Sequence, residues 1–121
     1  MPTPSGHTTA VRAKTVIGTG VKVSDGDKVG KIEDIVLDKM SNNVMFAVVG
    51  FGGVLGLGEK FHPVPWSSLD YDESDNCYRL DMSKEKIKSA PTESIEALTR
   101  DDGQALRDST YDYYGAKRYW S

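Results

Sequence analysis

Four side chains of the kinds found in hydrolases lie close together in this sequence: His62, Ser67, Ser68 and Asp70. A serine nucleophile, a histidine base and an orienting carboxylate catalyse acyl transfer only when they converge in space. In an extended strand, successive side chains point to opposite faces, so nearness in sequence does not bring them together. The chain also lacks the Gly-x-Ser-x-Gly elbow of the α/β-hydrolases. We expect no catalysis by this set, and expect His62 to be a half-buried strand residue.

A glycine-rich run over Phe51–Trp66 has the composition of a phosphate-binding loop but not its context. Such a loop needs backbone N–H groups at a helix N-terminus, usually with Gly-Lys-Ser/Thr. Here Gly58 is followed by Glu59, Lys60 and a predicted strand. We therefore interpret the run as a tight apolar crossing at the corner of a small, closed β-sheet. The residues of this structural motif are Gly52, Gly53, Gly56, Gly58, Pro63, Pro65 and Trp66.

Acidic residues and the single cysteine do not form a metal-binding pattern. Glu33, Asp34 and Asp38 lie on a predicted strand, and Asp25–Asp27 is too short for a twelve-residue calcium loop. Cys77 beside a tyrosine has no further ligands nearby, so we interpret it as a packing residue. Asp34 stands among isoleucines and valine, where a carboxylate needs donors, and we expect it to accept backbone N–H bonds at a bulge. We expect no metal and no cofactor.

The C-terminal segment is the best candidate for function, because it combines aromatic and basic side chains. These types dominate protein interfaces, and they could also stack on single-stranded nucleic acid. Two interpretations stay open: the segment covers its own barrel, or it contacts a partner. We expect residues 104–121 to be dispensable for folding but needed for association. The candidate interaction residues are Tyr111, Tyr113, Tyr114, Lys117, Arg118, Tyr119 and Trp120.

Bulk composition places the chain among soluble proteins with one domain. It has 121 residues, of which 38% are hydrophobic and 27% charged, with a net charge of −3. This acidic balance gives no general support for phosphate binding. One cysteine excludes an intrachain disulfide, the N-terminal residues lack the apolar block of a signal peptide, and no run is long enough to span a membrane. We expect a cytoplasmic protein.

Apolar residues and turn signals predict six short strands followed by helices. The apolar phase of the second strand shifts, which predicts a bulge near Asp34 or burial of both faces. The third is continuously apolar and is expected to be buried on both faces, whereas prolines place the fourth at an edge. The strands are centred on Val21 and Val23, then on Val29–Asp38, Val44–Val49, Lys60–Val64, Leu69–Tyr71 and Tyr78–Met82.

Helix signals begin after Met82. Ser83 is expected to cap a short helix over Lys84–Ser89, which Pro91 ends. Thr92 is expected to cap a second helix that stops at Gly103. The aromatic tail after it shows no clear period.

Together these features resemble the PRC-barrel family over roughly residues 17–91. The resemblance divides the chain into a flexible arm (1–16), a barrel domain (17–91) and a helical, aromatic extension (92–121). The residues that carry it are Val29–Asp38, Phe51–Lys60, Pro63–Trp66 and Ala90-Pro91.

The resemblance implies an all-β fold, a small six-stranded antiparallel barrel with a short α-helical C-terminal extension. The family includes the cytoplasmic domain of the photosynthetic reaction-centre H subunit and the C-terminal domain of the ribosome-maturation factor RimM, and stand-alone bacterial members. It therefore implies a non-catalytic protein-interaction or assembly module, which we expect to form a homo-oligomer. The alternative is an RNA- or ribosome-associated maturation factor by analogy with RimM, against which the acidic net charge counts.

Overall fold

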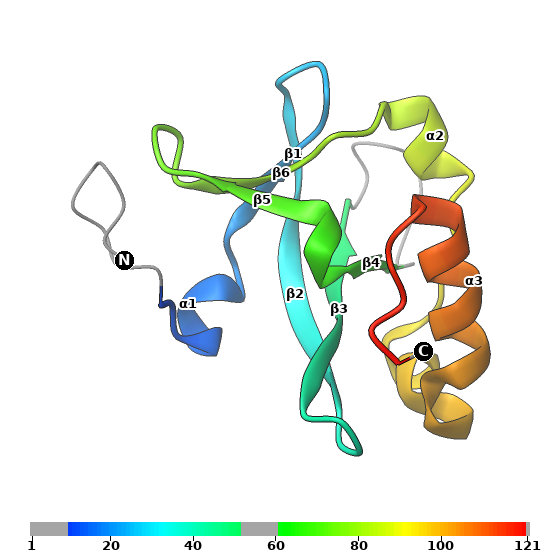
Figure 1. The fold of residues 1–121 in the computed structure, drawn as a ribbon. Coiled ribbons are helices and arrows are strands. Elements are labelled where there is room, and N and C mark those ends of the chain that lie inside the picture. Colours follow the sequence, from blue (N-terminus) through cyan, green and yellow to red (C-terminus); the bar gives the residue numbers. More distant parts are fainter. Residues whose placement is uncertain (1–9, 52–60, 121) are drawn as a thin grey trace.

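A curled six-stranded sheet forms the body of the protein (Figure 1). The structure, a computed structural model, describes residues 10–51 and 61–120. The sheet is a half-barrel with the strand order β4-β3-β2-β1-β6-β5, so β4 and β5 are its two end strands. The strands are β1 (Gly20–Lys22), β2 (Lys28–Asp38), β3 (Asn43–Gly50), β4 (His62–Pro65), β5 (Leu69–Asp72) and β6 (Cys77–Leu80).

One pairing corrects the expectation of a fully antiparallel barrel. Strands β1 and β6 are parallel, with Val21 opposite Tyr78 and Lys22 opposite Arg79. Parallel neighbours need a long connection, and here the whole of β2 to β5 lies between them. The other four pairs of neighbouring strands are antiparallel, so the sheet is mixed.

The predicted bulge in β2 is present. The register between β2 and β3 shifts between Ile32 and Asp34, and again between Val36 and Leu37. At the first shift, the N–H of Ile35 donates a 2.7 Å hydrogen bond to Asp34 Oδ1. Asp34 therefore accepts a backbone N–H at a bulge, as expected, although its side chain is exposed rather than buried.

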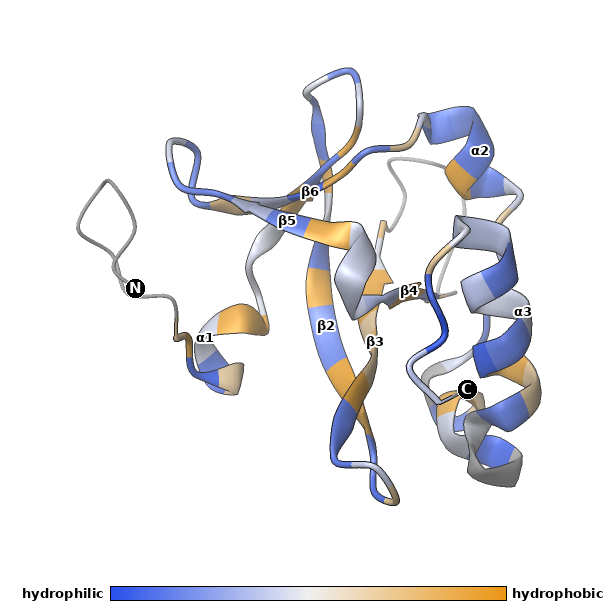
Figure 2. Ribbon diagram, viewed as in Figure 1, coloured by the Kyte–Doolittle hydropathy of each residue, from blue (hydrophilic) through white to orange (hydrophobic). Residues whose placement is uncertain are grey.

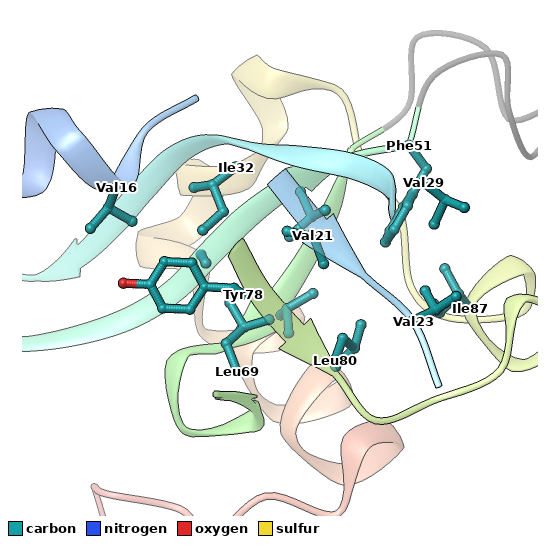
Figure 3. Packing of buried hydrophobic residues seen from close by; sticks show 13 residues of the cluster. Val16, Val21, Val23, Val29, Ile32, Phe51, Leu69, Tyr78, Leu80 and Ile87 are labelled. Carbon is teal, nitrogen blue, oxygen red and sulfur yellow. The ribbon is translucent and has the colours of Figure 1, made fainter. Parts of the chain in front are cut away.

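Side chains from the strands, α1 (Ala13–Val16) and α2 (Lys84–Lys88) form the main core (Figure 3). Figure 2 shows hydrophobic residues along the strands, whereas polar residues concentrate at the hairpin tips. Met45 to Val49 are all buried, which confirms that β3 is covered on both faces. Among the side chains of the main core are Val16, Val21, Ile32, Val49, Phe51, Val64, Tyr78, Leu80 and Ile87.

The N-terminal arm is shorter than predicted. Residues 13–16 form the helical turn α1 (Ala13–Val16), and Val16 is buried in the main core. A mobile arm over 1–16 is therefore wrong at its C-terminal end, because one apolar side chain there completes the core. Residues 1–9 lie outside the described part of the chain.

The C-terminal extension is helical and lies on the side of the sheet away from α1 (Figure 1). Helix α2 (Lys84–Lys88) begins as predicted, with Ser83 Oγ accepting the N–H of Lys86 at 3.2 Å. The second predicted helix is instead a 3₁₀ segment, η3 (Ile95–Gly103), which ends at the predicted glycine. Helix α3 (Gln104–Tyr114) then follows, and its last turns lie in the aromatic tail, where the sequence shows no clear period.

Candidate interaction surface

Helix α3 packs Tyr111 against the back of β3. Tyr111 is buried, and its hydroxyl donates a 2.7 Å hydrogen bond to the carbonyl oxygen of Met45. Met45, Phe46 and Tyr111 form a second core, called here the tail cluster. The half-buried side chains that pack against it are Val36, Leu106, Ala116, Tyr119 and Trp120.

Residues 116–120, called here the C-terminal strap, turn back after α3 and reach the end of β2. Gly115 adopts a left-handed conformation with φ of 64°, and the N–H of Ala116 bonds to the carbonyl of Tyr111 at 3.0 Å. Glycine reaches this conformation without a steric penalty. The turn brings the Tyr119 hydroxyl to Asp38, to which it donates a 2.7 Å hydrogen bond.

Two guanidinium groups lie near the Trp120 ring. The Arg107 guanidinium carbon is 3.8 Å from the centre of the indole ring, and that of Arg118 is 5.5 Å away. Arg118 is also paired with Asp112 at 2.8 Å. We call Arg107, Arg118, Tyr119 and Trp120 the aromatic–arginine patch. All four side chains are half-buried, so the patch lies at the surface. Tyr119 and Arg118 are held there by their bonds to Asp38 and Asp112.

The remaining candidate residues have different environments. Tyr113 donates a 2.5 Å hydrogen bond to the carbonyl of Lys86 and so ties α3 to α2. Tyr114 packs against the main core, where burial raises the pKa of its hydroxyl. Lys117 is exposed.

The tail therefore covers its own barrel, which was one of the two interpretations left open; contact with a partner stays a prediction. Because Tyr111 is buried, we now expect removal of residues 104–121 to destabilise the fold, rather than to leave it unchanged.

The contact between Tyr119 and Asp38 changes the acidity of both groups. The hydrogen bond from Tyr119 is the largest cause that holds the pKa of Asp38 below its usual value. Burial, followed by the same hydrogen bond, raises the pKa of Tyr119 to about 12. Both shifts favour a neutral phenol beside an ionised carboxylate at neutral pH.

The hydrolase-like residues do not form a site. His62 is fully buried, which corrects the expectation of a half-buried residue, and its Nε2 lies 3.1 Å from the carbonyl oxygen of Ile87. Its ring packs edge-on to Phe51, and burial lowers its pKa. Ser67 and Asp70 are exposed. A fully buried imidazole cannot act as a base for side chains that lie in solvent.

The other predicted features have mixed outcomes. Cys77 is buried, as expected of a packing residue. Pro63 and Pro65 are buried in β4, which lies at the edge of the sheet as predicted, and Trp66 is half-buried against the main core. The glycines of the crossing, at positions 52, 53, 56 and 58, fall outside the described residues.

Two kinds of feature are absent from the described part of the chain. Residues 10–51 and 61–120 contain no group of three or more His, Cys, Asp or Glu side chains that could hold a metal ion. Within the same ranges, no helix has the length and apolar character needed to cross a membrane.

Sequence reasoning missed α3 and the contacts that it makes. Leu106, Thr110 and Tyr114 are four residues apart and lie on one face of a helix, a spacing that could have indicated it. The hydrogen bond between Tyr119 and Asp38 had no local signal, because the two residues are 81 positions apart.

The fold agrees with a comparison to protein families. The model of the PRC-barrel domain matches residues 8–87, and the chain belongs to this family. No curated protein matches the chain. The matched range ends within α2, so α3 and the aromatic–arginine patch lie beyond it.

Proposed function

We propose that this PRC-barrel chain is a non-catalytic protein-interaction or assembly module, and that it self-associates in the cytoplasm. The observation that carries the proposal is the aromatic–arginine patch. Trp, Tyr and Arg contribute most of the binding energy at protein interfaces. Here Asp38 holds Tyr119 and Asp112 holds Arg118, so these two side chains have little entropy left to lose on binding.

A protein partner fits this patch better than RNA does. Stacking of a base requires an open aromatic face, and Arg107 occupies a face of Trp120 at 3.8 Å. The net charge of −3 also opposes attraction of a phosphate backbone. The RNA- or ribosome-associated alternative is therefore not the one we propose.

Sedimentation velocity of the full chain over a range of concentrations tests the proposal. Lys117 is exposed and lies within the strap that carries the patch, so Lys117→Glu changes the surface without removing a packing contact. We expect it to weaken self-association about tenfold, since charge reversal at an interface disfavours docking. Lys14→Glu is the matched control, because it makes the same charge change on α1, on the other side of the sheet (Figure 1).

A wild-type chain that sediments as a monomer at every concentration would contradict self-association. Equal effects of the two substitutions would show that net charge, rather than the patch, controls the assembly.

A further inference from the structure

Prolines in β4 determine which backbone groups of β3 face each neighbour. Pro63 lies opposite Val48, and Pro65 is in the same phase of the strand. Proline has no N–H, so its pair cannot exchange the two hydrogen bonds of an antiparallel ladder. The bonds to β4 must therefore come from the alternate pair, Ala47 and Val64. Val48 consequently presents its N–H and carbonyl to β2.

The same alternation fixes the orientation of β2. Asp34 is opposite Val48 and faces β3, whereas Ile35 is opposite Ala47, whose backbone groups point to β4. The N–H and carbonyl of Ile35 therefore point away from β3, toward the other edge of β2.

A neighbouring pair supports this assignment. Ile32 is opposite Val49, which is in the same phase as Ala47, so its backbone should also point outward. Its N–H bonds to the carbonyl of Thr19 at 2.9 Å, and its carbonyl accepts the N–H of Gly18 at 2.7 Å. Both partners lie on the edge opposite β3.

Beyond Ile32 this edge of β2 has no neighbouring strand in the described part of the chain, as the lower half of β2 in Figure 1 shows. The outward N–H of Ile35 is nevertheless satisfied, because it bonds to Asp34 Oδ1 at 2.7 Å. The carboxylate of one residue thus caps the outward donor of the next.

The surroundings make such a cap necessary. Leu37, on the same stretch of β2, is 64% exposed, and Ile35 is only half-buried. An unpaired strand edge with apolar side chains is a template for pairing with another chain. The outer edge of β4, at one end of the sheet, is protected differently, since its prolines have no outward N–H to offer.

We propose that Asp34 closes the free edge of β2 against a second copy of this chain. The outward donor and acceptor of Ile35 are self-complementary across a two-fold axis. Two copies arranged antiparallel about Ile35 would form a hydrogen-bonded pair between them. The Asp34 carboxylate accepts the Ile35 N–H, which is the donor that this intermolecular pair requires.

Three substitutions of Asp34 distinguish the effect of its hydrogen bond to the Ile35 N–H from the effect of its negative charge. Asp34→Ala removes both, Asp34→Asn keeps an acceptor oxygen without the charge, and Asp34→Glu keeps the charge but moves the carboxylate one methylene beyond the Ile35 N–H. Asp70→Ala is the matched control, because it removes an exposed carboxylate from β5. All are measured by sedimentation velocity in the full chain, in the wild-type and Lys117→Glu backgrounds, so that association through the C-terminal patch is distinguished.

We expect Asp34→Ala and Asp34→Glu to self-associate at least tenfold more tightly than the parent, and Asp34→Asn and Asp70→Ala to match it. Amide hydrogen exchange at Ile35 should be slow in the parent, and faster in monomeric Asp34→Ala at low concentration. If Asp34→Ala does not fold, Asp34→Glu carries the test. Unchanged association of Asp34→Glu, or equal association of Asp34→Ala and Asp34→Asn, would overturn the proposal.

Discussion

The hydroxyl of Tyr119 donates a 2.7 Å hydrogen bond to Asp38 Oδ2, which joins the C-terminal strap to the end of β2. Asp38 is itself held, because its other oxygen accepts the N–H of Met40 at 2.9 Å. The strap is therefore attached to a rigid turn rather than to a freely rotating side chain.

Tyr119→Phe tests this attachment. We expect the free energy of unfolding to fall by about 1 kcal/mol at neutral pH, the usual net value of one hydrogen bond. The pKa of Asp38 is lowered from 3.8 in the folded state, so the stabilisation is present above pH 3.8 and is lost as the pH falls through the lower folded value. Urea unfolding curves of variant and wild type should converge in acid; a constant difference would contradict the role of Asp38.

Two substitutions of Tyr111 distinguish the stabilisation by its packing from that by its hydrogen bond. Its ring is buried in the tail cluster, so Tyr111→Ala should cost about 3–4 kcal/mol, as for other large-to-small changes in a core. Tyr111→Phe removes only the bond to the Met45 carbonyl and should cost about 1–2 kcal/mol. Thermal melts of the two variants measure the difference. Two small and equal effects would show that α3 is not part of the core.

Two glycines on paired strands offer a matched comparison. A Cβ on Gly30 would lie 2.7 Å from Phe51 Cδ1 and 2.8 Å from the carbonyl oxygen of Gly50. At Gly20 the nearest atoms would be 3.9 Å away. We expect Gly30→Ala to destabilise the fold by about 1–3 kcal/mol through overpacking, and Gly20→Ala to have little effect. Equal melting temperatures of the two variants would contradict this close approach of β2 to Phe51.

His62 should make stability depend on pH near neutrality. Burial lowers its pKa from 6.5, and its Nδ1 has no hydrogen-bond partner. The unfolded chain therefore binds a proton more readily, so stability is complete above pH 6.5 and falls as the pH drops toward the lower folded value. Urea midpoints should decline between pH 7 and 5 in the wild type. His62→Gln should show a flatter profile over this interval, and an unchanged slope would assign the decline to other groups.

The sequence predicts the fold well wherever the signal is local. The prolines of β4 indicate an edge, the shifted apolar phase of β2 indicates its bulge, and Ser83 indicates the start of α2. Each signal concerns the backbone of the residue itself or of its close neighbours.

What the sequence does not predict depends on distant partners. The parallel pairing of Val21 with Tyr78 cannot be predicted from the sequence of either strand, because parallel and antiparallel strands have the same apolar pattern. The full burial of His62 depends on a carbonyl of α2, and the buried face of α3 is partly polar and weakens its period. The candidate residues were found by composition, but which of them support the fold follows only from their contacts.

The position of β1 between β2 and β6 has a consequence for synthesis on the ribosome. Strand β1 pairs with β2 within a few residues, but its other side waits until Tyr78 of β6 has left the ribosome. Such distant pairing slows folding and prolongs the exposure of apolar strands. The nascent chain therefore carries an unfinished sheet until β6 emerges, and the back of β3 remains uncovered until Tyr111 emerges.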